Sequence, residues 1–299
     1  FHKERALPQT SRDWIFAISL SVLACFLLAG MDNLGKILMR DGLPAAQVVW
    51  ARYSFHTLLV FLVLLPQKEV LFQRSVHPWI QFFRGLSLLA MTLCAYNAFK
   101  HAPIGEATAI MLLAPLIVTL LAGWLLKEKV LWWHWLAALL GFSGVIAITQ
   151  PGIENTNPYL YLALVAAFFY AFYLLMTRYL RGRDHTLKTL LNATLIGSVV
   201  MSLVVLPYWQ SPTMEQWMVL ISLGVLGALG HFCIIKAYNF GDASSLSPLL
   251  NTQIFAAALF SSFIFDDPLT TGFIVGALFI ISGAIVLWLG HLKRLDGSR

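Results

Sequence analysis

The sequence is poor in charge. Asp, Glu, Lys and Arg make up 11% of its 299 residues and hydrophobic residues make up 59%, whereas about a quarter of a typical soluble domain is charged. Apolar runs of about 20 residues, the length needed to cross a hydrocarbon core of about 30 Å, recur along almost the whole chain. The composition therefore excludes an ordinary soluble fold and leaves no room for a sizeable soluble domain.

Cysteine is also scarce, and the motifs of several enzyme classes are missing. The three cysteines, Cys25, Cys94 and Cys233, lie inside apolar segments, where a buried thiol is expected rather than a disulfide or a metal ligand. The chain contains no Walker loop, no HExxH or GxSxG motif and no acidic metal cluster. We therefore expect no ATP coupling within the chain, no metal, no cofactor and no enzymatic activity.

The basic residues explain membrane topology better than they explain a nucleic-acid partner. The formal net charge is +6, but no basic cluster is interleaved with aromatic residues on a polar surface. If the N-terminus is cytoplasmic, sixteen of the twenty Lys and Arg residues fall on the inner side. Because cytoplasmic loops accumulate Lys and Arg, this bias predicts that both termini are cytoplasmic and that nucleic acid is not a partner.

Ten apolar segments are bounded by Pro, Gly or charged residues. They cover residues 14–40, 45–65, 79–101, 104–126, 131–150, 158–180, 186–206, 215–239, 243–265 and 271–290. The first segment lacks a small-residue cleavage pattern, so we expect it to be a retained span and not a signal peptide. The predicted fold is an all-α membrane protein of ten transmembrane helices.

An internal repeat divides these segments into two groups of five. The stretch AFKHAPIGEATAIMLLAPLIVTLLAGWLLKEK, which starts at Ala98, resembles AYNFGDASSLSPLLNTQIFAAALFSSFIFDDP, which starts at Ala237. The following spans share a Ser-Gly pair, at residues 143–144 and 282–283. Because five spans is an odd number, the second repeat, residues 158–290, must be inverted relative to the first, residues 14–150. Inverted repeats are typical of secondary transporters, which bind substrate between the halves near the bilayer midplane.

Ionisable residues inside spans are functional candidates because each costs roughly 2.5–3.5 kcal/mol to insert at the bilayer centre. Asp32 and Lys36 are one turn apart on the first span, beside Asn33, and Arg52 lies on the second span at a similar depth. We expect Asp32, Lys36 and Arg52 to form a charge network toward the outer side. It either gates a cavity or contacts a zwitterionic substrate, and the alternative is a structural ion pair between the two helices.

Other candidates are polar or aromatic side chains within spans. Pro115 can bend the fourth span around a cavity, and Asn251 and Gln253 either line the cavity or join helices by hydrogen bonds. His231 is either an interhelical hydrogen-bonding residue or a proton carrier. Aromatic residues could form a wall for a flat substrate, with packing against lipid or helices as the alternative; these are Tyr96, Phe169, Tyr170 and Tyr173.

These features together resemble the drug/metabolite transporter superfamily, in its EamA branch of two five-helix repeats. The resemblance is carried by Trp50-Ala51-Arg52-Tyr53, by Ala98-Phe99-Lys100, by the mid-span Pro115 and by Lys127-Glu128-Lys129 at the end of that span. It covers essentially the whole chain. The chain also looks like the bacterial aromatic amino acid exporters of the YddG type, on overall similarity.

The resemblance implies a secondary transporter that exports aromatic and other neutral amino acids, and related metabolites, across the bacterial inner membrane. The expected partners are a small-molecule substrate and the lipid bilayer, and the expected state is a monomer or a homodimer. A multidrug or other metabolite exporter of the same superfamily is the main alternative. A membrane-embedded enzyme or a channel belongs to a different class, which would require convergent catalytic groups or transport without saturation.

Overall fold

The described part of the chain is helical. The computed structural model describes residues 11–102, 104–127, 129–149, 158–265 and 271–296, and these residues contain no strand. The longer helices are α1 (Ser11–Arg40), α2 (Ala45–Leu64), α4 (Pro78–His101), α7 (Trp132–Thr149), α8 (Leu160–Tyr179), α9 (Thr186–Val204), α10 (Met214–Phe240) and α13 (Thr271–Asp296). The shorter elements are α3 (Lys68–Phe72), α5 (Ile104–Met111), α6 (Ala114–Leu125), η1 (Leu206–Tyr208), α11 (Ala243–Leu246), η2 (Ser247–Asn251) and α12 (Thr252–Phe265).

Six of the described helices are long and apolar enough to cross a membrane: α1, α2, α4, α8, α9 and α10. Shorter apolar helical stretches cover Ala114–Leu125, Leu249–Ile264 and Ile274–Leu287. Many large apolar side chains of these helices are exposed at the protein surface, as expected where lipid and not water surrounds the protein.

The predicted fourth and ninth spans, residues 104–126 and 243–265, are each interrupted and contain more than one helical element. The first breaks between α5 and α6, and Pro115 lies in the first turn of α6. The second breaks at the 3-10 turn η2, which carries a proline in its own first turn. Proline lacks the backbone N–H that an interior helical position donates, so a helix accepts it most readily in its first turn.

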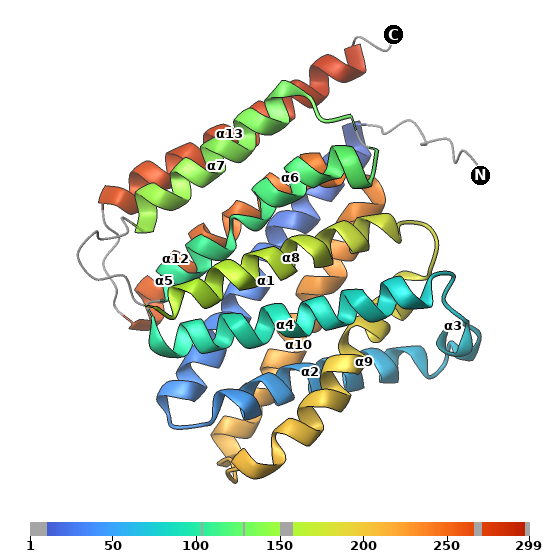
Figure 1. Cartoon of the computed structure of the whole chain (residues 1–299), viewed down its shortest axis with the longest axis vertical. Coiled ribbons are helices and arrows are strands. Elements are labelled where there is room, and N and C mark those ends of the chain that lie inside the picture. Colours follow the sequence, from blue (N-terminus) through green and yellow to red (C-terminus); the bar gives the residue numbers. More distant parts are fainter. Residues whose placement is uncertain (1–10, 103, 128, 150–157, 266–270, 297–299) are drawn as a thin grey trace.

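The remaining predicted spans each contain one helix with nearby ends. The largest difference is that α13 continues beyond residue 290 to Asp296. The short helix α3 forms between the second and third predicted spans. In Figure 1, helix α3 lies toward the same end of the bundle as the start of α1 and the end of α13. Segments 150–157 and 266–270 lie outside the described residues.

Helix packing follows a reciprocal pattern. The first helix of the chain, α1, packs against α10, whereas α4 packs against α8; likewise α2 contacts α10 and α4 contacts α9. Two further pairs, α2 with α9 and α7 with α13, join equivalent positions of the two sets of helices. Figure 1 shows α7 and α13 side by side along one edge of the bundle.

Glycine brings α7 and α13 together. A Cβ atom added to Gly144 would lie 2.7 Å from the carbonyl oxygen of Gly276, and one added to Gly283 would lie 3.1 Å from that of Ala137. Each helix therefore presents a glycine to the backbone of the other, an arrangement that allows close packing in a membrane. Gly144 and Gly283 belong to the two Ser-Gly pairs that relate the halves of the sequence.

Candidate functional site

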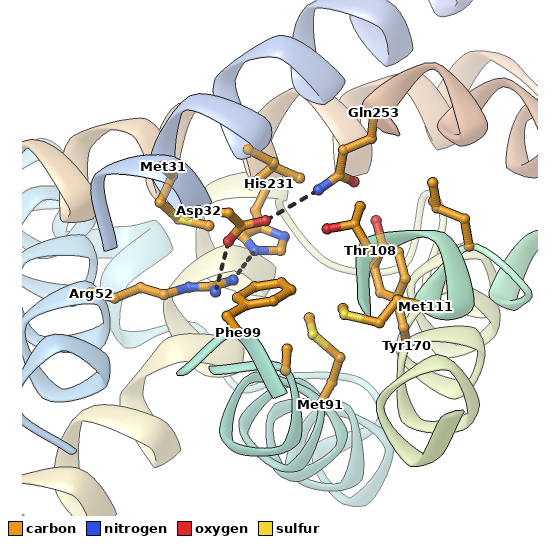
Figure 2. A pocket seen from close by; sticks show the side chains of 13 residues that line it. Met31, Asp32, Arg52, Met91, Phe99, Thr108, Met111, Tyr170, His231 and Gln253 are labelled. Carbon is orange, nitrogen blue, oxygen red and sulfur yellow. Dashed lines mark hydrogen bonds and ion pairs between the residues drawn. The ribbon is translucent and has the colours of Figure 1, made fainter. Parts of the chain in front are cut away.

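A small cavity lies in the interior of the helical bundle, with about 30 Å³ of free volume. Helices α1, α2, α4, α5, α8, α10 and α12 contribute its walls, so it draws on both halves of the chain (Figure 2). Its lining consists of Leu28, Met31, Asp32, Arg52, Met91, Ala95, Phe99, Thr108, Met111, Leu112, Tyr170, His231 and Gln253. The volume suffices for a water molecule and is too small for an organic solute.

One wall of this cavity carries a buried ion pair. Arg52 Nη1 of α2 lies 3.8 Å from Asp32 Oδ1 of α1, and the two side chains are 6% and 12% exposed. The amide nitrogen of Gln253, on α12, donates to Asp32 Oδ2 at 3.3 Å. The carboxylate is thus held by groups from two other helices, and Figure 2 shows it facing the cavity. These contacts offset part of the cost of burying the charges.

A histidine extends the network from this ion pair. Arg52 Nη2 donates to His231 Nε2 at 3.4 Å, because a guanidinium has no acceptor. With Nε2 accepting, the imidazole carries its proton on Nδ1, which lies 3.1 Å from the hydroxyl of Tyr173. His231 also stacks on His56, with ring centroids 5.9 Å apart. His231, on α10, is therefore fixed by contacts with α2 and α8 and holds the guanidinium in place.

The network continues to a second buried arginine. The guanidinium carbon of Arg84, on α4, lies 5.2 Å from the ring centroid of Tyr173. Arg84 donates to Thr177 Oγ1 at 3.0 Å and also to the backbone carbonyl of Thr189. Its side chain is fully buried. Tyr173 thus contacts Arg84 with its ring and His231 with its hydroxyl.

Aromatic rings enclose the guanidinium of Arg52. Its central carbon lies 5.7 Å from the ring centroid of Tyr96 and 6.0 Å from that of Tyr53. The hydroxyl of Tyr53 shares a hydrogen bond of 3.0 Å with Thr92. These rings add a cation-π contribution and limit the rotamers open to Arg52, so its donors are directed toward the cavity.

The other walls are mainly apolar. Met31, Met91 and Met111 approach from three helices, together with Phe99. Methionine is flexible and polarisable, so this wall can adapt to the shape of an apolar group. The hydroxyl of Tyr170 is buried and has no hydrogen-bond partner among the described residues, which leaves it available to a molecule in the cavity.

The structure brings together several of the residues singled out from the sequence. Asp32, Arg52, Tyr170, His231 and Gln253 line the cavity. Tyr96 and Tyr173 lie directly behind them, against Arg52 and His231.

The other candidates lie away from the described lining. Asn33 faces its own helix, where its amide donates to Ala29 O at 2.9 Å, and Lys36 is half-buried one turn further along α1. Asn251 packs against α7, with its amide nitrogen 1.9 Å from the position of a Cβ on Gly141. Pro115 lies in the first turn of α6, and Phe169 packs against the core of the bundle.

Sequence reasoning did not single out Arg84, Met91, Met111 or Thr108 as site residues. Arg84 does carry a sequence signal, because a cation within an apolar span is rare. The methionines give no such signal, because apolar residues that face a cavity and those that face lipid have the same composition.

Comparisons with known proteins agree with this geometry. The EamA-like transporter family matches residues 15–150 and again residues 157–289. A solved crystal structure of another protein superposes with a TM-score of 0.77 over 96% of this chain and 99% of its own, at 18% identity. That likeness shows a shared fold.

Relatives with assigned substrates are similar over most of their length. A riboflavin transporter from Vibrio cholerae is 30% identical, covering 71% of this chain and 72% of its own. An S-adenosylmethionine uptake transporter from Rickettsia bellii is 27% identical, covering 85% and 87%. A pseudopaline exporter from Pseudomonas aeruginosa is also 27% identical, covering 76% and 80%. These names do not single out the aromatic amino acid exporters. The matches across both halves show that this chain belongs to the EamA-like transporter family of multi-pass membrane proteins.

Proposed function

We propose that the chain is a secondary transporter for small metabolites that carry an α-amino carboxylate group, amino acids with apolar side chains in particular. The observation that carries this proposal is the pairing of Asp32 with Arg52 on one wall of a central cavity. A zwitterionic head group has the complementary pair of charges. Its carboxylate would bind the guanidinium, and its ammonium would bind Asp32.

The geometry of the Asp32–Arg52 pair suits an exchange in which each residue gives up its contact with the other and binds the opposite charge of the substrate. At 3.8 Å the two groups attract each other but lie beyond ordinary hydrogen-bond distance. A carboxylate that met the guanidinium would form shorter, charge-assisted hydrogen bonds. Gln253 and His231 would keep Asp32 and Arg52 in place during the exchange.

The apolar walls support a substrate with an apolar or flat portion beyond its head group. Met31, Met91, Met111 and Phe99 would contact this portion. S-adenosylmethionine, the substrate named for the Rickettsia relative, is a molecule with both an α-amino carboxylate and a flat adenine. Riboflavin, named for the Vibrio relative, lacks the zwitterionic head and is the second candidate.

Transport would proceed by alternating access of two inverted halves, residues 14–150 and 158–290, with ten spans and cytoplasmic termini in the bacterial inner membrane. The reciprocal packing of α1 on α10 and of α4 on α8 supports this division. The free volume of about 30 Å³ corresponds to a closed state. Substrate entry would separate the halves on one side and widen the cavity.

The test is counterflow in proteoliposomes that contain the purified protein. Labelled phenylalanine, threonine and methionine are offered outside vesicles loaded with unlabelled substrate, with and without a pH gradient. We expect saturable uptake that trans-substrate accelerates, and the effect of the gradient reports proton coupling. Cold S-adenosylmethionine and riboflavin serve as competitors.

A lack of uptake by correctly inserted protein would refute the amino acid assignment. Transport of riboflavin alone would favour the second candidate, and uptake that never saturates would contradict a carrier. A second experiment loads the labelled substrate inside the vesicles and follows its efflux, which gives the preferred direction of transport. Export is the expected result.

A further inference from the structure

A second cavity, distinct from the central one, lies between the starts of α4 and α9. Its volume is about 420 Å³, and it includes residues of the connection that precedes α4. Hydrogen bonds hold this connection against α9: Lys188 Nζ donates to Leu71 O at 2.6 Å, and the amide of Asn192 donates to Ser75 Oγ at 2.8 Å. The cavity is therefore a defined feature of the fold, at the end of the bundle where α3 lies (Figure 1).

The polar part of this cavity is cationic. Arg74 is exposed and Lys188 is half-buried, and both line it. The nearby carboxylate of Asp184 is already engaged, because it accepts hydrogen bonds from the backbone N–H of Val76 and from the amide of Gln81, both at 2.9 Å. Two cations thus face the cavity, and an anion is the complementary ligand.

One buried acceptor also remains unused. Gln81 is 3% exposed and lines the cavity, and its amide nitrogen donates to Asp184 and to Thr189. Its amide oxygen has no hydrogen-bond partner among the described residues. A buried acceptor without a partner is costly. A ligand that combines an anion with a hydroxyl donor would satisfy both Gln81 and the two cations.

The apolar part of the cavity continues along the outside of the bundle. Phe82 and Leu195 line the cavity and are 43% and 46% exposed. One turn further, Leu86 of α4 and Val199 of α9 are 42% and 58% exposed. These side chains form two parallel apolar rows that run from the cavity toward the middle of the helices, which suits an acyl chain.

Helix packing explains why the cavity forms at this position. A Cβ atom on Gly85 would lie 2.9 Å from the side chain of Ile196 and 3.0 Å from the carbonyl oxygen of Ala193. The two helices therefore meet closely at Gly85 and leave the cavity on the side of their N-terminal ends. Trp79, in the first turn of α4, is 73% exposed; exposed tryptophan at a helix end is typical of the membrane interface.

We propose that this cavity binds one anionic phospholipid of the phosphatidylglycerol type. The phosphodiester would lie between Arg74 and Lys188, a glycerol hydroxyl would donate to the amide oxygen of Gln81, and an acyl chain would follow Phe82 and Leu195. Basic pockets between helices at the membrane surface are suited to anionic head groups. The site does not depend on which substrate the central cavity transports.

The test is native mass spectrometry of the purified protein with added phosphatidylglycerol or phosphatidylcholine of matched chain length. The wild-type protein should retain phosphatidylglycerol preferentially. Each lost cation should weaken binding about fivefold. Arg74→Gln should therefore lower binding by that factor, and Arg74→Gln/Lys188→Gln by about twenty-five-fold. Gln81→Leu should reduce the preference for phosphatidylglycerol over phosphatidic acid, which has no glycerol hydroxyl.

The matched control is Lys100→Gln, which removes an exposed cation at the other end of α4 and should leave binding unchanged. Arg74→Gln, at an exposed position, keeps the test valid if the double variant folds poorly. Equal retention of the two lipids by the wild-type protein would overturn the proposal, as would undiminished binding by Arg74→Gln. Binding of soluble glycerol phosphate as tightly as of the lipid would show an anion site and contradict a lipid site.

Discussion

Substitutions in the buried pair of Asp32 and Arg52 should destabilise the protein singly and compensate each other in part when combined. Asp32→Asn keeps the shape of the side chain but removes the negative charge. Arg52, a residue that is 5% exposed, then carries a buried charge without its carboxylate partner. Arg52→Gln does the reverse. Removing one partner of a buried ion pair typically costs about 3–5 kcal/mol, most of it the penalty of the unpaired charge.

The double variant should restore part of this loss. With both charges removed, neither remains uncompensated, and His231 and Gln253 can still bond to the amides. At roughly 2–4 °C per kcal/mol, each single variant should melt about 6–20 °C below the wild-type protein. The double variant should melt above Asp32→Asn, with a coupling energy of at least about 1 kcal/mol.

The assay is thermal unfolding in detergent, followed by tryptophan fluorescence, for the four members of this cycle. Lys100→Gln, at an exposed position on α4, controls for loss of charge as such. All three cycle variants should fail to transport a zwitterion, because each lacks at least one of its two partners. If the single losses in melting temperature simply add in the double variant, the two residues are not coupled and the proposed recognition loses its basis.

Three other substitutions test separate parts of the structure. Tyr170→Phe removes a buried hydroxyl without a described partner, so thermal stability should stay equal or rise while the affinity measured by counterflow falls about fivefold. Tyr173→Phe breaks the hydrogen bond of 3.1 Å to His231 and should slow counterflow about fivefold, with the protein still folded by circular dichroism. Gly144→Ala places a Cβ atom 2.7 Å from the carbonyl oxygen of Gly276 and should lower the melting temperature more than Gly283→Ala, where the contact is 3.1 Å.

Composition and periodicity were sufficient to predict an all-helical membrane protein, and the repeat and local motifs predicted its family. The break in the fourth span was harder to predict. Pro115 indicated a bend, but a proline inside a span and a proline that begins a new helix give the same local sequence. The structure shows the second arrangement, with α6 beginning at Ala114.

The charged site could be predicted in part because charge within an apolar span is rare. Asp32 and Arg52 stood out for that reason, but the sequence could not give the rotation of each helix about its axis. Asn33 and Lys36 lie within one turn of Asp32 on α1, yet the described lining of the cavity contains Asp32 alone of the three. The partners Gln253 and His231 come from distant helices, and only the folded chain brings them to the ion pair.

The measurement that tests the central claim most directly is competition against labelled phenylalanine in wild-type proteoliposomes, using analogues that each lack one charge. Phenethylamine lacks the carboxylate that would meet Arg52, and 3-phenylpropionate lacks the ammonium that would meet Asp32. A lost charge-assisted contact is worth about 1.5–3 kcal/mol, so each analogue should compete at least about tenfold more weakly than phenylalanine. Competition by either analogue as strong as that by phenylalanine would show that the corresponding charge is not recognised and would contradict the account.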